Sequence, residues 1–357
     1  MARPSDAASS QAFAVEGIDA PKVTDWFTAN LADVTPPLTF RLIAGGRSNR
    51  TYRVEDAAGR AFALRRPPVS HVLPTAHDMS REHRLMTALG PTPVPVPVTY
   101  GLCTDEAVNG APFYVMEFVD GHIVRQAEEA EAAFDLATRR EVGGHMAETL
   151  ATLHAVDVDA VGLGDLARHD GYIERQLKRW RGQYEQMAVP GEDHGGVIER
   201  VGEKLASSVP GQQAVAIVHG DYRLDNVVLD DAGRVRAILD WEICTLGDPL
   251  ADIGLLLVYW AEPGEKDTAL VGVAPTTVEG FASRADVLAR YAELSGLDVS
   301  NVDYYMAFGY WKLACVLQGV YTRYQAGAGA GDQASVDAYL PHVRRLAETA
   351  EAKLSTP

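Results

Sequence analysis

The first third of the chain consists mainly of short runs with the apolar and polar alternation of β-strands. One amphipathic helix precedes them, in which Val23, Phe27 and Leu31 recur at helical spacing. Gly-Gly and Ala-Ala-Gly turns separate the β-like runs, as in antiparallel hairpins. The elements predicted here are a helix over residues 22–34, strands over 38–44, 48–54 and 61–66, a helix over 79–89, an extended proline-rich connector over 91–97 and a strand over 112–119.

Helical periodicity dominates the chain after Gly121, with one β-rich interruption. Long helices are predicted over residues 131–156, 171–187, 196–208, 249–259, 278–294, 302–324 and 334–353. The interruption contains predicted strands over residues 214–219, 227–229 and 235–239. The pattern predicts an α+β protein with a tail and helix over residues 1–36, a small β-rich N-lobe over 37–118, and a larger helical C-lobe over 119–357, with a hinge around 117–121.

Composition places the chain among ordinary globular proteins. Its 357 residues are 47% hydrophobic and 23% charged, and the formal net charge is −17. Nucleic-acid-binding surfaces are basic, so this charge argues against a nucleic-acid partner. The cysteines, Cys103, Cys244 and Cys315, lie far apart, which favours a reducing compartment over a disulfide framework or a zinc site. With no signal-like N-terminus and no apolar run of the ~18 residues that a membrane span needs, we expect a cytoplasmic protein without a membrane partner.

The strongest chemical motif is His219-Gly220-Asp221, at the end of a predicted strand. Asn226 follows the aspartate by five residues, and a predicted hairpin then returns Asp240. Phosphoryl transfer needs a carboxylate that orients and deprotonates the attacking hydroxyl, and oxygen ligands that hold Mg²⁺ against the phosphates. Each residue alone also fits an ordinary role in a turn. Their spacing together favours a phosphotransferase.

The pattern H-G-D-x-x-x-x-N followed by I-L-D-W resembles the aminoglycoside phosphotransferase and choline kinase-like family, and the resemblance extends from Phe40 to Tyr324. Members of that family have a two-lobed protein-kinase fold and phosphorylate hydroxyl groups of small molecules. The resemblance implies ATP and Mg²⁺ as cofactors, Asp221 as the catalytic base, and Asn226 and Asp240 as Mg²⁺ ligands. It also implies that Asp252 braces the catalytic loop.

A glycine pair between the first two predicted strands lies where kinases have a phosphate-covering loop. It lacks the third glycine of the G-x-G-x-x-G pattern and has Ser48-Asn49 there instead. We expect the loop from Gly45 and Gly46 to Asn49, including the Ser48 hydroxyl, to contact phosphate oxygens. A plain hairpin turn fits the same residues.

The strand lysine of kinases is missing, because no lysine lies between Lys22 and Lys178. Arg65 stands in its place, and Glu82 on the next predicted helix is the expected partner. A guanidinium binds phosphate and carboxylate through paired N–H groups, so arginine suits this position. An exposed surface pair is the other interpretation of these two residues.

The segment from Met116 to Val119 resembles the hinge of kinases, which binds the adenine edge. The resemblance implies that the Glu117 carbonyl and the Val119 N–H group contact the base and that Met116 lines the pocket. A buried strand end would be equally apolar.

One predicted helix carries a basic stripe. Arg175, Lys178 and Arg179 fall at i, i+3 and i+4, beside Trp180 and Tyr184. Such a stripe suits an anionic acceptor with a flat ring, such as coenzyme A, although an ordinary surface helix with acidic neighbours has the same pattern. The whole segment also resembles the kinase-like proteins and domains associated with acyl-CoA dehydrogenases, which implies a hydroxyacyl-CoA acceptor.

Other function classes explain fewer of these residues. An aminoglycoside acceptor would need clustered carboxylates, which acidic runs around residues 128–131 and 192–193 could provide. A non-catalytic nucleotide-binding module is expected to have lost Asp221, Asn226 or Asp240. A protein kinase needs a longer peptide-docking segment than residues 240–248 allow. The G-x-S-x-G and H-E-x-x-H motifs of hydrolases are absent from the sequence.

Overall fold

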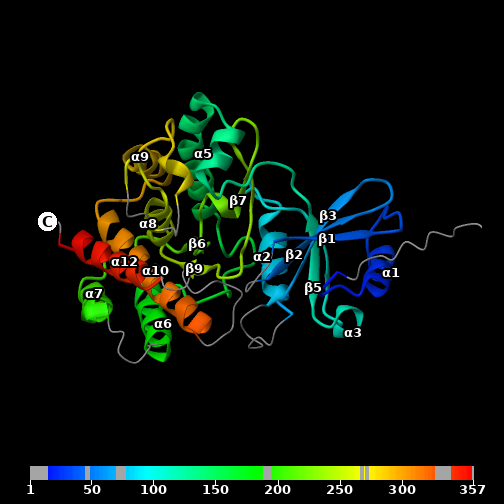
Figure 1. Ribbon diagram of the computed structural model, residues 1–357, viewed down its shortest axis with the longest axis horizontal. Helices are drawn as coiled ribbons and strands as arrows, with labels where there is room; N and C mark the ends of the chain where they lie inside the picture. Colours follow the sequence, from blue (N-terminus) through cyan, green and yellow to red (C-terminus); the bar gives the residue numbers. More distant parts are fainter. Residues whose placement is uncertain are drawn as a thin grey trace, which may run out of the picture. The chain divides into compact units, whose positions relative to one another are not determined.

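The computed structural model describes residues 15–44, 49–69, 78–187, 194–265, 269, 273–325 and 339–355. These residues form two compact units. The N-lobe contains the described residues up to Thr87 together with Pro97–Phe118, and the C-lobe contains Ala88–Val96 and the described residues from Val119 onward. Figure 1 shows the strands of the N-lobe and the helices of the C-lobe.

A five-stranded antiparallel sheet forms the N-lobe, in the order β1-β2-β3-β5-β4. Its strands are β1 Thr39–Ala44, β2 Arg50–Glu55, β3 Ala61–Arg66, β4 Thr99–Cys103 and β5 Phe113–Glu117. Three helices accompany it, α1 Ala20–Asn30, α2 Met79–Leu89 and α3 Glu106–Asn109. Val23 and Phe27 of α1 pack into a buried cluster with Tyr52, Phe62 and Phe113 of the sheet, which is the core of this lobe.

Strand register gives the sheet two different faces. Thr51 pairs with Arg65, and Arg65 pairs with Tyr114, so these three residues are neighbours across β2, β3 and β5. Successive residues of a strand point to opposite faces, which separates Arg65 from Arg66. The register therefore determines which of the two adjacent arginines can meet α2.

Helices make up most of the C-lobe. They are α4 Ala127–Ala133, α5 Leu136–His154, α6 Tyr172–Gln186, α7 Val197–Ser207, α8 Leu250–Tyr259, α9 Arg284–Ser295, α10 Val302–Gln325 and α12 Tyr339–Lys353. Helix α10 packs against α6, α7, α8 and α12, and α5 packs against α9 (Figure 1). No helix among the described residues combines the length and the apolar character needed to cross a membrane.

Two short antiparallel strand pairs lie among the helices of the C-lobe. β6 Ala216–Val218 pairs with β9 Thr245–Gly247, and β7 Val227–Leu229 pairs with β8 Val235–Ile238. The 3₁₀ turn η2 Leu224–Asn226 lies between β6 and β7. These strands are short but largely buried, so they hold the segments between them in fixed positions.

Most predicted elements are confirmed within a few residues, and the exceptions have local causes. The predicted helix over 131–156 is two helices, because the chain is extended at Phe134 and the Asp135 carboxylate caps α5 by accepting from the Thr138 amide at 2.8 Å. The predicted helix over 278–294 begins only at Arg284, after a capping box of Ser283 and Asp286.

Among the described strands and α-helices, α3, β4 and β9 were not predicted, because each is only three to five residues long, too short for a periodicity signal. The first residues of the predicted helix over 334–353 lie outside the described residues, and α12 accounts for the part from Tyr339.

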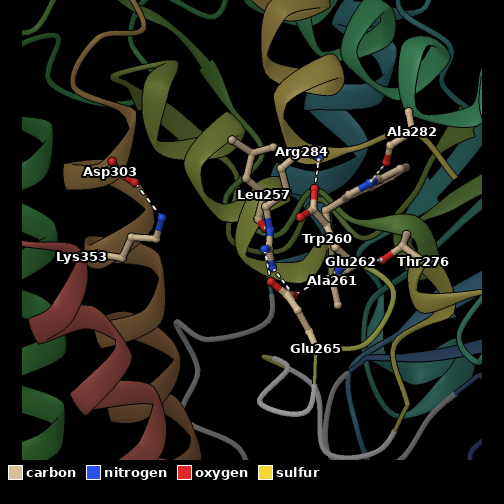
Figure 2. Close-up of polar contacts among 10 residues, drawn as sticks. All are labelled: Leu257, Trp260, Ala261, Glu262, Glu265, Thr276, Ala282, Arg284, Asp303 and Lys353. Carbon is tan, nitrogen blue, oxygen red and sulfur yellow. Dashed lines mark hydrogen bonds and ion pairs between the residues drawn. The ribbon is translucent and has the colours of Figure 1, made fainter. Parts of the chain in front are cut away.

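A polar cluster fixes the end of α8. The Arg284 side chain donates from Nε to the Leu257 carbonyl at 2.8 Å, and its Nη2 lies 2.7 Å from Glu265 Oε2. The Trp260 indole donates to the Ala282 carbonyl at 2.8 Å. Figure 2 shows these bonds joining the end of α8 and the following loop to the start of α9. They matter for function because α8 carries side chains that contact the predicted catalytic loop.

Candidate active site

Strand β6 leads directly into the loop that contains His219, Gly220 and Asp221. Gly220 has a φ of +84°, in the left-handed region that glycine adopts without the steric penalty of a side chain. A Cβ atom at this position would also lie 3.2 Å from the Ile243 side chain. The local sequence therefore permits a tight reversal immediately before Asp221.

Asp252 of α8 holds this loop through two backbone groups. Its carboxylate accepts from the His219 amide at 2.6 Å and from the Gly220 amide at 2.8 Å, and the side chain is fully buried. Burial alone would raise the pKa of Asp252, but hydrogen bonds from His154 and from the loop amides hold it below its ordinary value. The bracing contact expected of Asp252 is thus present in the structure.

His219 packs within the loop, with both ring nitrogens engaged. Its Nε2 lies 2.9 Å from the Leu239 carbonyl oxygen, which can only accept, so Nε2 carries the proton. Its Nδ1 accepts from the Asp221 amide at 3.2 Å. This ring links the loop of Asp221 to the residue before Asp240.

Asp221 and Asn226 are in direct contact. The Asn226 side chain donates from Nδ2 to Asp221 Oδ2 at 2.9 Å and to the Asp221 carbonyl at 2.8 Å. The Asp221 side chain is 30% exposed, so a hydroxyl group can reach it from solvent. Because the amide nitrogen of Asn226 is occupied by Asp221, its amide oxygen is the atom that it would offer to a cation.

Asp240 lies on the neighbouring segment, after β8. Leu239 connects the two segments, because its amide donates to the Asn226 carbonyl at 2.8 Å while its own carbonyl accepts from His219. Asp240 has a φ of +63°, which a non-glycine residue rarely adopts. Such strained backbone is found preferentially at functional sites.

Arg223 was not among the predicted site residues, and the structure places it beside Asp221. Its Nε lies 3.4 Å from Asp221 Oδ2, its Nη2 lies 2.9 Å from Asp225 Oδ2, and its guanidinium lies 4.8 Å from the ring centre of Tyr259. Burial lowers the pKa of Arg223, but Asp221 and the other neighbouring acidic groups raise it by more than burial lowers it. The pKa therefore lies above its ordinary value, and Arg223 stays charged. Burial raises the pKa of Asp225. The sequence signal that could have identified Arg223 is the alternation of acidic and basic residues at positions 221, 223 and 225.

Lys312 of α10 was also missed, because it lies 91 positions after Asp221 in an otherwise apolar stretch. Its Nζ donates to the Gly220 carbonyl at 2.7 Å and lies 5.5 Å from the ring centre of Trp180. Only 8% of the residue is exposed. A buried cation therefore contacts the backbone immediately before the predicted base.

The N-lobe brings Arg65 and Glu82 together as a buried ion pair. The Arg65 Nε lies 2.9 Å from Glu82 Oε2, and the two side chains are 9% and 2% exposed. Glu82 also accepts from the Tyr114 hydroxyl at 2.9 Å, and Arg65 donates to the Thr51 hydroxyl at 3.3 Å. The pairing expected from the sequence is present, and the interpretation as an exposed surface pair is wrong.

Asn49 joins the same network. Its side-chain amide donates to Glu82 Oε1 at 2.6 Å, and the residue is buried. Gly45, Gly46 and Ser48, the other predicted phosphate-loop residues, lie outside the described residues, so their predicted role stays a prediction. The contact with Glu82 anchors Asn49 to α2.

The predicted hinge residues follow β5. Met116 is buried and pairs with Ala63 and Thr99 across the sheet, and Glu117 accepts from the Val98 amide through its side chain at 3.3 Å. Val119 is half-buried. Their contacts with a nucleotide stay a prediction.

The five predicted acceptor residues have different environments on α6. Arg175 donates to the backbone carbonyls of Asp170 and Arg168 at the start of the helix. Lys178 and Arg179 are exposed, and the Arg179 guanidinium lies 5.0 Å from the ring centre of Trp180. Trp180 and Tyr184 are themselves buried. Of these five residues, Trp180 is the one with a described contact to Lys312, which in turn donates to the Gly220 carbonyl.

The oxygen ligands near Asp221 fit Mg²⁺ bound to a nucleotide. Mg²⁺ prefers oxygen ligands and is usually held by one or two carboxylates together with substrate phosphates and water. Asn226 and Asp240 offer an amide oxygen and a carboxylate. Within the described part of the chain no group of three or more His, Cys, Asp or Glu side chains is arranged to hold a metal ion. An amide oxygen and a carboxylate fit a Mg²⁺ ion whose other ligands are phosphates and water.

Comparison with known proteins gives a family match over most of the chain. The profile of the phosphotransferase enzyme family, APH, matches residues 39–294. The chain is 34% identical over 307 residues to acyl-CoA dehydrogenase family member 10 of Mus musculus, and 34% identical over 319 residues to probable acyl-CoA dehydrogenase IBR3 of Arabidopsis thaliana. These alignments cover 82% and 84% of this chain but 27% and 38% of those proteins. The chain thus spans only a minor part of the length of these relatives.

Solved structures with similar folds are kinases and phosphotransferases. A candidate aminoglycoside phosphotransferase from Ralstonia eutropha has a TM-score of 0.77 and 29% identity, over 94% of this chain and 98% of that chain. Amicoumacin kinase in complex with AMP-PNP and Ca²⁺ has a TM-score of 0.59 and 18% identity, over 94% of both chains. Choline kinase from Cryptosporidium parvum has a TM-score of 0.61 and 12% identity, over 91% and 95%. The predicted kinase-like α+β fold is confirmed.

Proposed function

Because the chain belongs to the phosphotransferase enzyme family, we propose that it transfers the γ-phosphoryl group of ATP to a hydroxyl group of a small molecule, with Asp221 as the catalytic base. Kinase-like structural neighbours support the use of a nucleotide, and one of them was solved with AMP-PNP and a divalent cation.

One observation carries the proposal. Asp221 presents a partly exposed carboxylate whose Oδ2 is held by Asn226 at 2.9 Å, and the Asn226 carbonyl in turn binds the segment of Asp240. A base, an amide oxygen and a second carboxylate are thus connected through a few hydrogen bonds. This is the set of groups that phosphoryl transfer to an alcohol requires.

Asp221 would orient the acceptor hydroxyl and accept its proton as the new bond to phosphorus forms and the bond from phosphorus to the ADP leaving group breaks. The Asn226 amide keeps one carboxylate oxygen in a fixed direction, and Arg223 supplies a compensating positive charge 3.4 Å from the same oxygen. Asn226 and Asp240 would hold Mg²⁺. When bound, that ion would neutralise part of the phosphate charge.

The N-lobe residues would bind the nucleotide. Arg65 is fixed by Glu82 on one side and by Thr51 on the other, so its guanidinium is oriented before any ligand arrives. A positioned guanidinium loses little side-chain freedom when it binds phosphate oxygens. Asn49 and the preceding glycine loop would cover the phosphates, and the Met116 to Val119 segment would contact the base.

For the acceptor we propose an anionic alcohol, specifically a hydroxyacyl-CoA thioester. Arg179 and Lys312 both lie near the ring of Trp180, and Lys312 donates to the Gly220 carbonyl, so one positive charge lies beside the loop of the predicted base and a second lies at the same tryptophan. Positive charge favours an anionic ligand over a polycation. The names of two relatives, which are called acyl-CoA dehydrogenases, also support this acceptor, although the chain spans only part of their length.

An aminoglycoside acceptor is the second candidate, and the Ralstonia eutropha neighbour is the observation that favours it. The decisive experiment offers radiolabelled ATP with a 4-hydroxyacyl-CoA, with kanamycin and with choline. We expect label to transfer to the thioester, and Arg179→Gln to raise the KM for it. Arg181→Gln is the matched control, because Arg181 is exposed on the same helix and pairs only with Glu185 in the described structure. Transfer to kanamycin alone, unchanged in Arg179→Gln, would contradict the proposed acceptor.

A further inference from the structure

Lys312 is a buried lysine with an unusual set of contacts. It projects from α10, where Trp311, Leu313, Ala314 and Cys315 are all buried, and its Nζ donates to the Gly220 carbonyl at 2.7 Å. Beyond this bond, the described contact of the ammonium is with the ring face of Trp180. An apolar side chain of similar length would fill this space without burying a charge.

Burying this ammonium is unfavourable. Desolvation of a lysine costs several kcal/mol unless charges and hydrogen bonds compensate it. Burial lowers the pKa of Lys312. The charges of Asp221 in the catalytic loop and Asp252 on α8 oppose that shift, and the charge of Arg179 on α6 adds to it. The charges that compensate the buried ammonium are therefore those of Asp221, the predicted base, and Asp252, which binds the loop amides. Among the described residues, these charges connect Lys312 to the catalytic loop and to no other polar cluster.

The hydrogen bond falls on one particular peptide group. The carbonyl of Gly220 and the amide of Asp221 belong to the same peptide plane. Lys312 binds its oxygen, and the His219 ring accepts from its nitrogen at 3.2 Å. Asp252 holds the preceding amide of Gly220 at 2.8 Å. Glycine is the residue with the greatest backbone freedom, so without these anchors the plane before Asp221 would be free to rotate.

We propose that Lys312 is a positioning residue for Asp221: by holding the Gly220 carbonyl it fixes the peptide plane from which the side chain of the base projects. This inference rests on the proposed function for the role of Asp221. The contact of Lys312 with the loop does not depend on that function. Removing Lys312 lets the plane rotate, and displacement of a catalytic group by about 1 Å costs up to about 100-fold in rate.

The test combines kinetics with amide hydrogen exchange. Lys312→Met removes both the donor and the charge at nearly the same volume, and Lys312→Arg keeps both. We expect Lys312→Met to lower kcat by about 10- to 100-fold with the KM for ATP unchanged within a few-fold, and Lys312→Arg to recover part of the loss. Hydrogen exchange of the amides over residues 217–226 should accelerate in Lys312→Met. If Lys312→Met does not fold, Lys312→Leu replaces it, because leucine also removes both the donor and the charge, and the same changes in kcat and exchange are expected.

Gln318→Met is the matched control. Gln318 is also a buried polar residue of α10, but it contacts His194 and not the catalytic loop. We expect this variant to change thermal stability while kcat and exchange over residues 217–226 stay at wild-type values. Unchanged kcat and unchanged exchange in Lys312→Met would overturn the positioning role. If the wild-type protein phosphorylates no acceptor but exchange still accelerates in Lys312→Met, the anchor stands and the proposed function fails.

Discussion

The side-chain nitrogen of Asn226 lies 2.9 Å from Oδ2 of Asp221, within one short loop. This contact orients the predicted base and at the same time directs the amide oxygen of Asn226 away from it. We propose that one asparagine serves two purposes: it holds the predicted base, and it would offer its amide oxygen to a cation. The same loop is bound to the Asp240 segment through Leu239.

The metal site predicts a graded response to substitution. Asp240→Ala and Asn226→Ala should each raise the Mg²⁺ concentration needed for half-maximal activity, with Asp240→Ala the more severe because it removes a charge opposite Mg²⁺. A Mg²⁺ titration of initial rates at saturating ATP measures this. Asp303→Ala is the control, since Asp303 is half-exposed and pairs with Lys353. An unaltered Mg²⁺ requirement in both variants would show that Asn226 and Asp240 do not bind Mg²⁺.

Arg65 and Arg66 are adjacent but should behave differently. Arg65→Ala breaks the pair with Glu82, so we expect a higher KM for ATP and a lower kcat, while Arg65→Lys should keep part of the activity. Arg66 instead contacts the backbone carbonyls of Gly17 and Asn109. Arg66→Ala should therefore lower the melting temperature with little effect on the KM for ATP. The opposite pattern would mean that the functional arginine has been misassigned.

Much of the site was predictable because its residues are close in sequence or fixed by register. Asp221 and Asn226 share one loop, and the strand pattern gave Arg65 the correct face for Glu82. Lys312 could not be found in this way, because α10 contacts the loop only after the C-lobe has packed. Arg175 shows the opposite limit: helical spacing placed it on a basic stripe, but its guanidinium binds carbonyls before the helix, which periodicity cannot reveal.

Asp252 should affect both the geometry of the catalytic loop and the stability of the protein in acid. Asp252→Asn leaves one side-chain oxygen where two loop amides need acceptors, so we expect lower kcat and a loss of about 2–5 kcal/mol in the free energy of unfolding. The pKa of Asp252 is lowered in the folded protein. Its ionised form therefore stabilises the protein above the unfolded pKa of about 3.9, and this contribution disappears as the pH falls through the folded value.

Urea unfolding of wild type and Asp252→Asn between pH 7 and pH 3 measures both effects. The difference in stability between the two proteins should be largest near neutral pH and should shrink as the pH falls. A constant difference across this range would show that the charge of Asp252 does not stabilise the loop.

Arg284 should matter for stability and not directly for chemistry. Arg284→Met removes the pair with Glu265 and the bond to the Leu257 carbonyl (Figure 2). We expect a loss of about 1–2 kcal/mol, less than for a fully buried pair, because the Glu265 side chain is 34% exposed. Arg344→Met is a matched control, since the described ion pair of Arg344 with Glu348 is exposed on α12. Equal melting temperatures for the two variants would contradict this ranking.

Transfer from ATP by wild type and by Asp221→Asn tests the central claim most directly. Asparagine keeps the shape and the contact with Asn226 but cannot accept the hydroxyl proton. With the acceptor that the wild type phosphorylates, single-turnover transfer of radiolabel should be undetectable in Asp221→Asn, while the Kd for Mg·ATP stays within a few-fold. Transfer by Asp221→Asn at the wild-type rate would show that Asp221 is not the base.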